Sequence, residues 1–323
     1  MKIPISPTWI FSPIFIRYYY RSFYSSIRFR CPMNLHSIFL YIATVTIWGS
    51  TWIAITFQLG SVDPVASVIY RMLIASALLF LLCKLKGISL QLSIKNHQFI
   101  ALQGLCLFGI NYWAIYHAEL YLPSGIIAVI FSLIVFFNII NARLFLNYPF
   151  SFNIIIGGII GLLGISLLFY PELTKLSSTT MAIKGFLFAL AGAMFASLGN
   201  IAATRNGLLG ISVWSINAWG TFYGTLALLI IALVSNTQLS FDQSTEYILS
   251  LLYLSVFGTI IAFGAYLKLL VVIGPEKAGY TGLLIPFFAL LISTVFEDYQ
   301  WTTMAVVGFA LVALGNFMVM KRR

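Results

Sequence analysis

Charged residues are scarce in this sequence, and this excludes an ordinary soluble fold. Asp, Glu, Lys and Arg make up 8% of the 323 residues, whereas about 25% is usual in a soluble domain. Hydrophobic residues make up 61% of the chain. A soluble core cannot hide that much apolar surface, because the buried fraction rises only slowly with chain length. We therefore expect lipid to surround most of the chain, with no room left for a soluble domain.

Acidic residues are rarer still, and this disfavours two kinds of mechanism. All eight Asp and Glu residues fall at expected helix ends or in loops, so a proton relay through a carboxylate in the middle of the membrane is not predicted. A membrane-embedded enzyme needs clustered carboxylates, a His–acid pair or a nucleophile with its base. The sequence has no Asp-rich, HExxH or GxSxG motif, so an enzyme is not expected. A sensory protein is also disfavoured, because the loops are too short to form an output domain.

Cysteine is rare as well. Cys31, Cys83 and Cys106 lack the spacing of metal ligands and suggest no pairing, so we predict no disulfide, metal site or cofactor. In a soluble protein, the net charge of +10 would suggest that the protein binds nucleic acid. Here the basic residues lie at the ends of apolar segments and report topology instead, so no nucleic-acid partner is expected.

Long apolar runs fill the chain from Leu35 onward and alternate with short polar breaks. A helix of about 20 apolar residues crosses a bilayer. The sequence therefore predicts ten transmembrane helices, at residues 36–57, 65–84, 98–118, 123–145, 153–170, 183–203, 211–234, 247–268, 276–296 and 301–320.

The basic residues predict the orientation of these helices. With the N-terminus in the cytoplasm, every Lys and Arg except three falls on the cytoplasmic side, as the positive-inside rule requires. Lys175 and Lys184 fall outside, and Arg71 lies within a span. We expect a multi-pass protein of the inner (plasma) membrane with both termini in the cytoplasm.

The two halves of the chain look alike. Residues 121–125 and 273–279 each contain Pro and Gly and directly precede a long apolar helix. Five spans in each half would invert the second half relative to the first, and inverted repeats are typical of transporters with a site between them near the middle of the membrane. The predicted fold is all-α, with ten transmembrane helices as two inverted five-helix repeats at 35–172 and 180–320. Residues 1–34 form a basic, aromatic extension, either a mis-called start upstream of Met33 or an interfacial segment.

Several of these segments resemble the drug/metabolite transporter superfamily, in particular its EamA-type members. Residues 48–54 (WGSTWIA) are similar to the signature of the first helix, and residues 111–125 to the junction of the third and fourth helices. The remaining similar positions are Pro64, Arg71 and Ala75 of the second helix, and Pro286, Glu297 and Trp301 around the ninth.

The resemblance extends over 36–320 and implies a transporter rather than a particular substrate. The first half departs from the pattern, because Ile134 and Tyr148 stand near the places of the expected Pro and Glu. The implied mechanism is alternating access between the two repeats, with the substrate bound in a central cavity.

Arg71 is the sharpest candidate for substrate binding. It is expected roughly 10 Å into the second helix from the outer end, since a helix rises about 1.5 Å per residue. A charge inside the membrane is costly and usually faces a cavity or a partner. Arg71 is therefore predicted to attract a substrate carboxylate or phosphate. The alternative is a structural arginine that snorkels or pairs with an acid such as Glu119.

Other polar and aromatic side chains share helix faces inside the predicted spans. Tyr112, Tyr116 and Glu119 fall on one face of the third span, and Trp48 and Trp52 lie one turn apart in the first. The Asn side chains among them could instead form hydrogen bonds between helices. Gly157 and Gly161 are expected to allow close contact between helices. The predicted cavity lining is Arg71, Trp48, Trp52, Tyr112, Tyr116, Glu119, Asn138, Asn200 and Asn217.

These observations favour a secondary transporter that exports a small metabolite such as an amino acid. A flippase for a lipid headgroup or an isoprenoid-linked substrate is the alternative, ahead of a membrane-embedded enzyme. The expected partners are a small-molecule substrate and the lipid bilayer, and the sequence leaves open whether the protein is a monomer or a homodimer.

Overall fold

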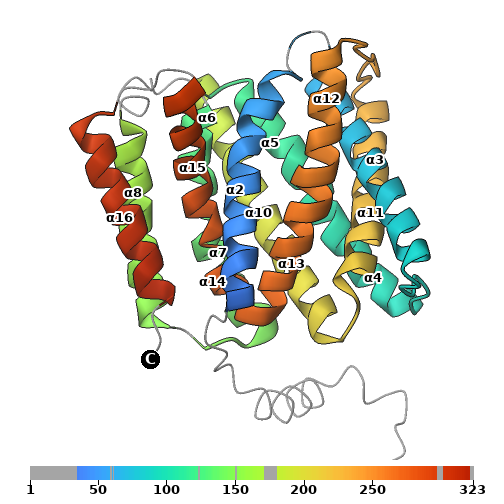
Figure 1. The fold of residues 1–323 in the computed structure, drawn as a ribbon, viewed down its shortest axis with the longest axis horizontal. Helices are drawn as coiled ribbons and strands as arrows, with labels where there is room; N and C mark the ends of the chain where they lie inside the picture. The colour runs from blue at the N-terminus through green and yellow to red at the C-terminus, as the bar shows by residue number, and fades with distance from the viewer. Residues whose placement is uncertain are drawn as a thin grey trace, which may run out of the picture.

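A computed structural model describes residues 35–58, 60, 62–122, 124–149, 151–170, 180–296 and 301–320. Within these ranges all regular structure is helical and no strand occurs. The helices run side by side in one bundle (Figure 1). We call the end at which α2 begins the lower end, and the end at which α2 stops the upper end. The predicted N-terminal extension at 1–34 and the predicted turn residue Glu297 lie outside the described residues.

The bounds of the helices follow the apolar runs of the sequence. In chain order they are α2 (Leu35–Thr56), α3 (Pro64–Leu85), α4 (Ile94–Gln103), η2 (Gly104–Ile110), α5 (Asn111–Glu119), α6 (Ser124–Phe131), α7 (Ile134–Leu146), α8 (Phe152–Leu168), α10 (Thr180–Leu208), α11 (Val213–Val234), α12 (Thr245–Tyr253), η3 (Leu254–Ile261), α13 (Ala262–Ile273), α14 (Pro275–Ala278), α15 (Thr281–Phe296) and α16 (Thr303–Met320).

Each predicted span falls on one helix or on a run of adjoining helices. Among the described residues, seven helical runs are long and apolar enough to cross a membrane. The apolar helices α8 and α16 are shorter. The protein is thus an all-helical, multi-pass membrane protein, while ten crossings in two inverted repeats stay a prediction.

Two long helices change their hydrogen-bond spacing in the middle. The run from α4 to α5 contains the π-helical segment η2, and the run from α12 to α13 contains the π-helical segment η3. A π-turn bonds each residue to the fifth along and is often found at functional sites. These segments shift the direction of every side chain that follows them, which a uniform helical period in the sequence does not reveal.

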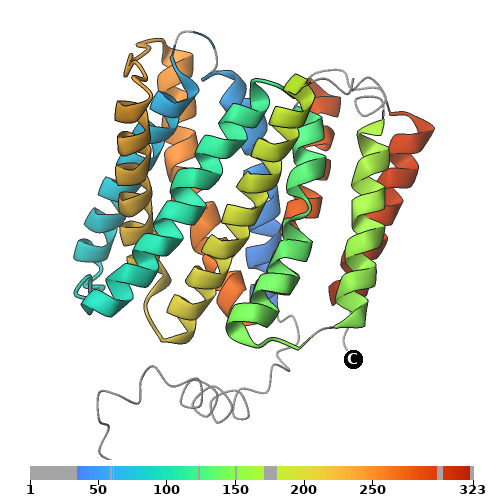
Figure 2. The ribbon, with the colours of Figure 1, turned by 180° about the vertical axis from the view of Figure 1, so that it is seen from behind.

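Glycines bring α8 and α16 into backbone contact at one edge of the bundle, in both views (Figures 1 and 2). A Cβ atom added to Gly308 would lie 2.6 Å from the carbonyl oxygen of Gly164. One added to Gly315 would lie 2.6 Å from the carbonyl oxygen of Gly157. The expected close contact of the fifth predicted span is therefore present, because only glycine lets two helix backbones approach so closely.

Amides and hydroxyls tie other helices together. The Asn141 Nδ2 atom on α7 donates to the Ser197 Oγ atom on α10 at 2.9 Å. The Tyr41 hydroxyl on α2 donates to the Asn316 Oδ1 atom on α16 at 2.7 Å. Lipid cannot satisfy these polar groups, so they find partners on neighbouring helices.

Candidate substrate cavity

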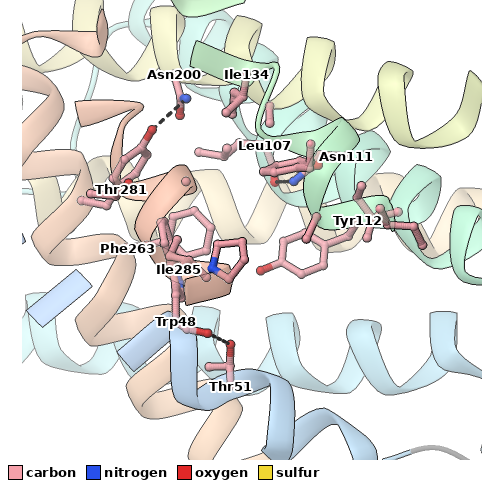
Figure 3. A pocket seen from close by; sticks show the side chains of 18 of the residues that line it. Trp48, Thr51, Leu107, Asn111, Tyr112, Ile134, Asn200, Phe263, Thr281 and Ile285 are labelled. Atoms are coloured by element: carbon pink, nitrogen blue, oxygen red, sulfur yellow. Dashed lines mark hydrogen bonds between the residues drawn. The ribbon is translucent and has the colours of Figure 1, made fainter. Parts of the chain in front are cut away.

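A cavity of about 200 Å³ lies between the first and second halves of the chain. Figure 3 shows Trp48, Phe263 and Ile285 on one side of it, and Asn111 and Tyr112 on the other. Its lining comes from α2, α3, η2, α5, α6, α7, α10, α13 and α15.

The walls of the cavity are mainly apolar and aromatic. The Trp48 ring lies 4.8 Å from the Phe263 ring and 5.0 Å from the Tyr266 ring, between centroids. The Trp48 Nε1 atom donates to the carbonyl oxygen of Gly258 at 3.0 Å. Buried indole N–H groups require such a partner, and this one fixes the orientation of the ring on the cavity wall.

Arg71 brings a positive charge to this apolar surface. Its side chain is only 3% exposed and lines the cavity. The Nε atom donates to the Thr259 Oγ1 atom at 2.8 Å, and the guanidinium carbon lies 5.4 Å from the centroid of the Tyr112 ring. Glu119 lines the same cavity, but the two side chains form no ion pair in the described structure. The predicted alternative of an Arg71–Glu119 pair is not seen in this conformation, and the guanidinium has no carboxylate partner among the described residues.

Hydrogen bonds join four helices between the cavity and the lower end of the bundle. The Asn200 Nδ2 atom donates to the Tyr266 hydroxyl at 2.9 Å and to the Asn138 Oδ1 atom at 3.3 Å. The Asn138 Nδ2 atom donates in turn to the carbonyl oxygen of Pro275 at 3.1 Å. We call Asn138, Asn200, Tyr266 and Pro275 the amide floor. It joins α7, α10, α13 and α14, so it connects helices from both halves of the chain.

The structure brings six of the nine predicted lining residues together. Three of them, Tyr112, Tyr116 and Glu119, share one face of α5 as their spacing indicates. His117 lies on another face of α5, where its Nδ1 atom is 2.8 Å from the carbonyl oxygen of Trp113. The six lining residues are Trp48, Arg71, Tyr112, Tyr116, Glu119 and Asn200.

The other three predicted residues do not join them. Asn138 is fully buried below the cavity, where its amide forms part of the floor. Asn217 is also fully buried, and its side chain makes no hydrogen bond in the described structure. It lies on the face of α11 that continues through Gly220, which packs against Phe108 of η2. Trp52 lies in α2, and its side chain is outside what the structure describes.

Several lining residues escape the sequence analysis. The polar residues Thr51, Asn111, Tyr266 and Thr281 also line the cavity. Tyr266 carried a usable signal, because a hydroxyl deep in an apolar run needs a partner just as the singled-out amides do. Thr51 and Asn111 belong to the two motifs at 48–54 and 111–125, but neither motif singles them out. Thr281 carried no signal. The hydroxyls of Thr51 and Thr281 bond to carbonyl oxygens of their own chain segment, as Thr commonly does inside helices.

The cavity lining combines charged, polar and aromatic groups. Over the part of the chain that the structure describes, no group of three or more His, Cys, Asp or Glu side chains could hold a metal ion. A guanidinium with free N–H groups, one carboxylate, several aromatic rings and two amides remain. Such groups recognise a small polar molecule with an apolar part.

Comparison with known proteins decides the family. The EamA-like transporter family matches residues 35–170 and 183–321. The chain belongs to the EamA-like transporter family. This confirms the resemblance seen in the sequence, and it identifies the protein as a membrane transporter rather than an enzyme.

Three relatives illustrate the range of this family. The "Uncharacterized inner membrane transporter YedA" of Escherichia coli (strain K12) is 28% identical over 85% of this chain and 90% of that protein. The "Probable amino-acid metabolite efflux pump" of the same strain is 23% identical over 86% of this chain and 93% of that protein. A solved crystal structure with 15% identity superimposes with a TM-score of 0.75, covering 87% of this chain and 95% of that one, which indicates a common fold only.

Proposed function

We propose that this EamA-like transporter is a secondary transporter that exports amino acids with an apolar side chain by alternating access between two helical repeats. The proposed repeats are residues 35–172 and 180–320, and the two family matches at 35–170 and 183–321 support this division. Helices from both contribute to the cavity and to the amide floor. Rocking of one repeat against the other would open the cavity to each side in turn.

The buried guanidinium of Arg71 carries this proposal, because it has no carboxylate partner among the described residues. A buried charge without a counter-ion is expensive in a medium of low dielectric constant. A ligand carboxylate would provide the missing counter-charge, and guanidinium and carboxylate groups can form two parallel hydrogen bonds. The cavity therefore selects molecules with an anionic group.

The other end of such a ligand has matching partners. Glu119 lines the cavity near the upper end of α5 and offers an acceptor for an ammonium group. The aromatic walls around Trp48 and Phe263 offer an apolar surface for a side chain. One carboxylate, one ammonium group and one apolar side chain describe an amino acid. One relative, the "Probable amino-acid metabolite efflux pump", carries a related substrate class in its printed name.

We further propose that the upper end faces away from the cytoplasm. Lys84, Lys86, Lys95 and Arg143 belong to helix ends at the lower end, and positive side chains favour the cytoplasmic side. The hydrogen bonds of the amide floor lie on that side of the cavity. The described conformation would then be one in which the cavity is shielded from the cytoplasm.

Metabolite profiling of the medium and the cytosol tests this proposal. Cells would express the wild type, Arg71→Met or nothing. A matched control is Lys84→Met, which removes a positive charge from the exposed lower end of the same helix α3. We expect amino acids with apolar side chains to build up in the medium with the wild type and with Lys84→Met, but not with Arg71→Met.

Two results would contradict the proposal. One is a wild-type medium that matches that of the empty cells although the protein is present in the membrane. The other is normal export by Arg71→Met, which would show that the charge has no part in selecting the substrate. Build-up inside the cell instead would reverse the direction and refute export.

A further inference from the structure

The side chain of Thr259 lies directly behind the guanidinium of Arg71. The Thr259 Oγ1 atom accepts a hydrogen bond from the Arg71 Nε atom at 2.8 Å. The same Oγ1 atom donates to the carbonyl oxygen of Leu254 at 3.1 Å. Its single proton is thus engaged with the backbone, and a lone pair is left to point at Arg71.

The π-helical segment η3 makes this arrangement possible. In an α-helix a Thr hydroxyl bonds to the carbonyl three or four residues earlier, whereas Thr259 bonds to Leu254, five residues earlier. This is the spacing of a π-turn. The widened turn therefore sets the direction in which the hydroxyl of Thr259 points.

Gly258, the residue before Thr259 in η3, contacts both Arg71 and Trp48 of the cavity wall. A Cβ atom added to Gly258 would lie 3.0 Å from the Arg71 Nη2 atom and 3.0 Å from the Thr51 Cγ2 atom. The carbonyl oxygen of Gly258 accepts the hydrogen bond of the Trp48 indole. Two adjacent residues of η3 thus hold two lining side chains, although neither of the two lines the cavity itself.

We propose that Thr259 is a positioning residue that orients Arg71 for the substrate carboxylate without cancelling its charge. This inference rests on the proposed transport of amino acids. A neutral hydroxyl uses only the Nε–H group and leaves the Nη groups for the ligand. A carboxylate at this position would also orient Arg71, but it would supply the counter-charge that the substrate should bring.

Exchange of labelled amino acid across proteoliposomes tests this role. The purified full-length protein would be reconstituted, and counterflow of labelled L-phenylalanine and L-leucine would be measured for the wild type, Thr259→Val and Thr259→Ser. We expect Thr259→Val to raise KM about tenfold, the loss expected when a hydrogen bond to a charged group is removed. The maximal rate should stay within about twofold, and Thr259→Ser should restore KM, because Ser keeps the hydroxyl.

Phenethylamine separates positioning from a general structural effect. It keeps the aromatic ring and the ammonium group of phenylalanine but has no carboxylate. Its inhibition constant against L-leucine exchange should be the same for the wild type and Thr259→Val. Thr225→Val is the matched control, because Thr225 is also buried in a helix and bonds only to its own helix through the Thr221 carbonyl oxygen.

The second probe of this role is Thr259→Asp. Its carboxylate should pair with Arg71 and raise KM for both amino acids at least as much as Thr259→Val does. A Thr259→Val protein with wild-type KM would refute the positioning role. An equal loss of affinity for phenethylamine and L-phenylalanine would refute it too. Absence of exchange by the wild type would instead refute the amino-acid substrate, and the role of Thr259 with it.

Discussion

Replacement of Gly308 by alanine should loosen the contact between α8 and α16. The added Cβ atom would lie 2.6 Å from the carbonyl oxygen of Gly164 and 2.9 Å from the amide nitrogen of Leu168. The first of these distances is about 0.8 Å below the 3.4 Å at which ordinary van der Waals contact begins. Both neighbouring atoms belong to backbone, so neither can rotate away, and the two helices must separate.

Two opposing terms set the size of this effect. Overpacking of a tight contact costs about 1–3 kcal/mol, while alanine gains up to about 1 kcal/mol over glycine in helix propensity. We expect a net loss of about 1–2 kcal/mol in the free energy of unfolding. In lipid the contact has no hydrophobic driving force to compensate, because α8 and α16 associate through packing alone.

The assay is reversible unfolding of the purified protein in mixed micelles with increasing denaturing detergent. Gly264→Ala is the matched control, because a Cβ atom there meets only the Trp214 ring at 3.6 Å. This control should be neutral or slightly stabilising. The reasoning would be refuted if Gly308→Ala were as stable as Gly264→Ala, since backbone contact would then not hold the two helices together.

Two further predictions concern the helix contacts and the orientation. In a double-mutant cycle of Asn141→Ala and Ser197→Ala, measured by the same unfolding assay, we expect a coupling energy of about 0.6 kcal/mol, the mean for such bonds in membranes, and no more than about 1.7 kcal/mol. A coupling energy of zero would show that the bond does not contribute to stability. In a variant with its native cysteines replaced by serine, an impermeant maleimide should label Gln238→Cys in intact cells but label Gln91→Cys only after permeabilisation. Both side chains are exposed in loops at opposite ends of the bundle, and the reverse pattern would overturn the proposed orientation.

Much of the fold follows from apolar runs and basic residues alone. The helices occupy the predicted ranges because about 20 apolar residues without a polar break have no other stable form in lipid. The resemblance of residues 48–54 and 111–125 to known transporters was sufficient to predict the family that the comparison confirms. Arg71 could be singled out because a charge in an apolar run needs a reason to be there.

The placement of individual side chains depended on the neighbouring helices. Asn138 and Asn200 look equivalent in the sequence, since each is an amide in an apolar run. In the structure Asn200 reaches the cavity while Asn138 donates to the Pro275 carbonyl oxygen beneath it. Asn217 is also an amide in an apolar run, but it is fully buried on a face of α11 that packs against other helices.

The sequence by itself thus determined that lipid surrounds the chain, where its helices run and which family it belongs to, because these depend on local composition and on short motifs. Only the tertiary structure decided which polar groups meet. The bond from Arg71 to Thr259 joins residues 188 positions apart and depends on a π-turn in η3. A regular α-helical period would point the Thr259 side chain in a different direction. The contact with Arg71 therefore depends on the π-helical turn, which the sequence pattern does not reveal.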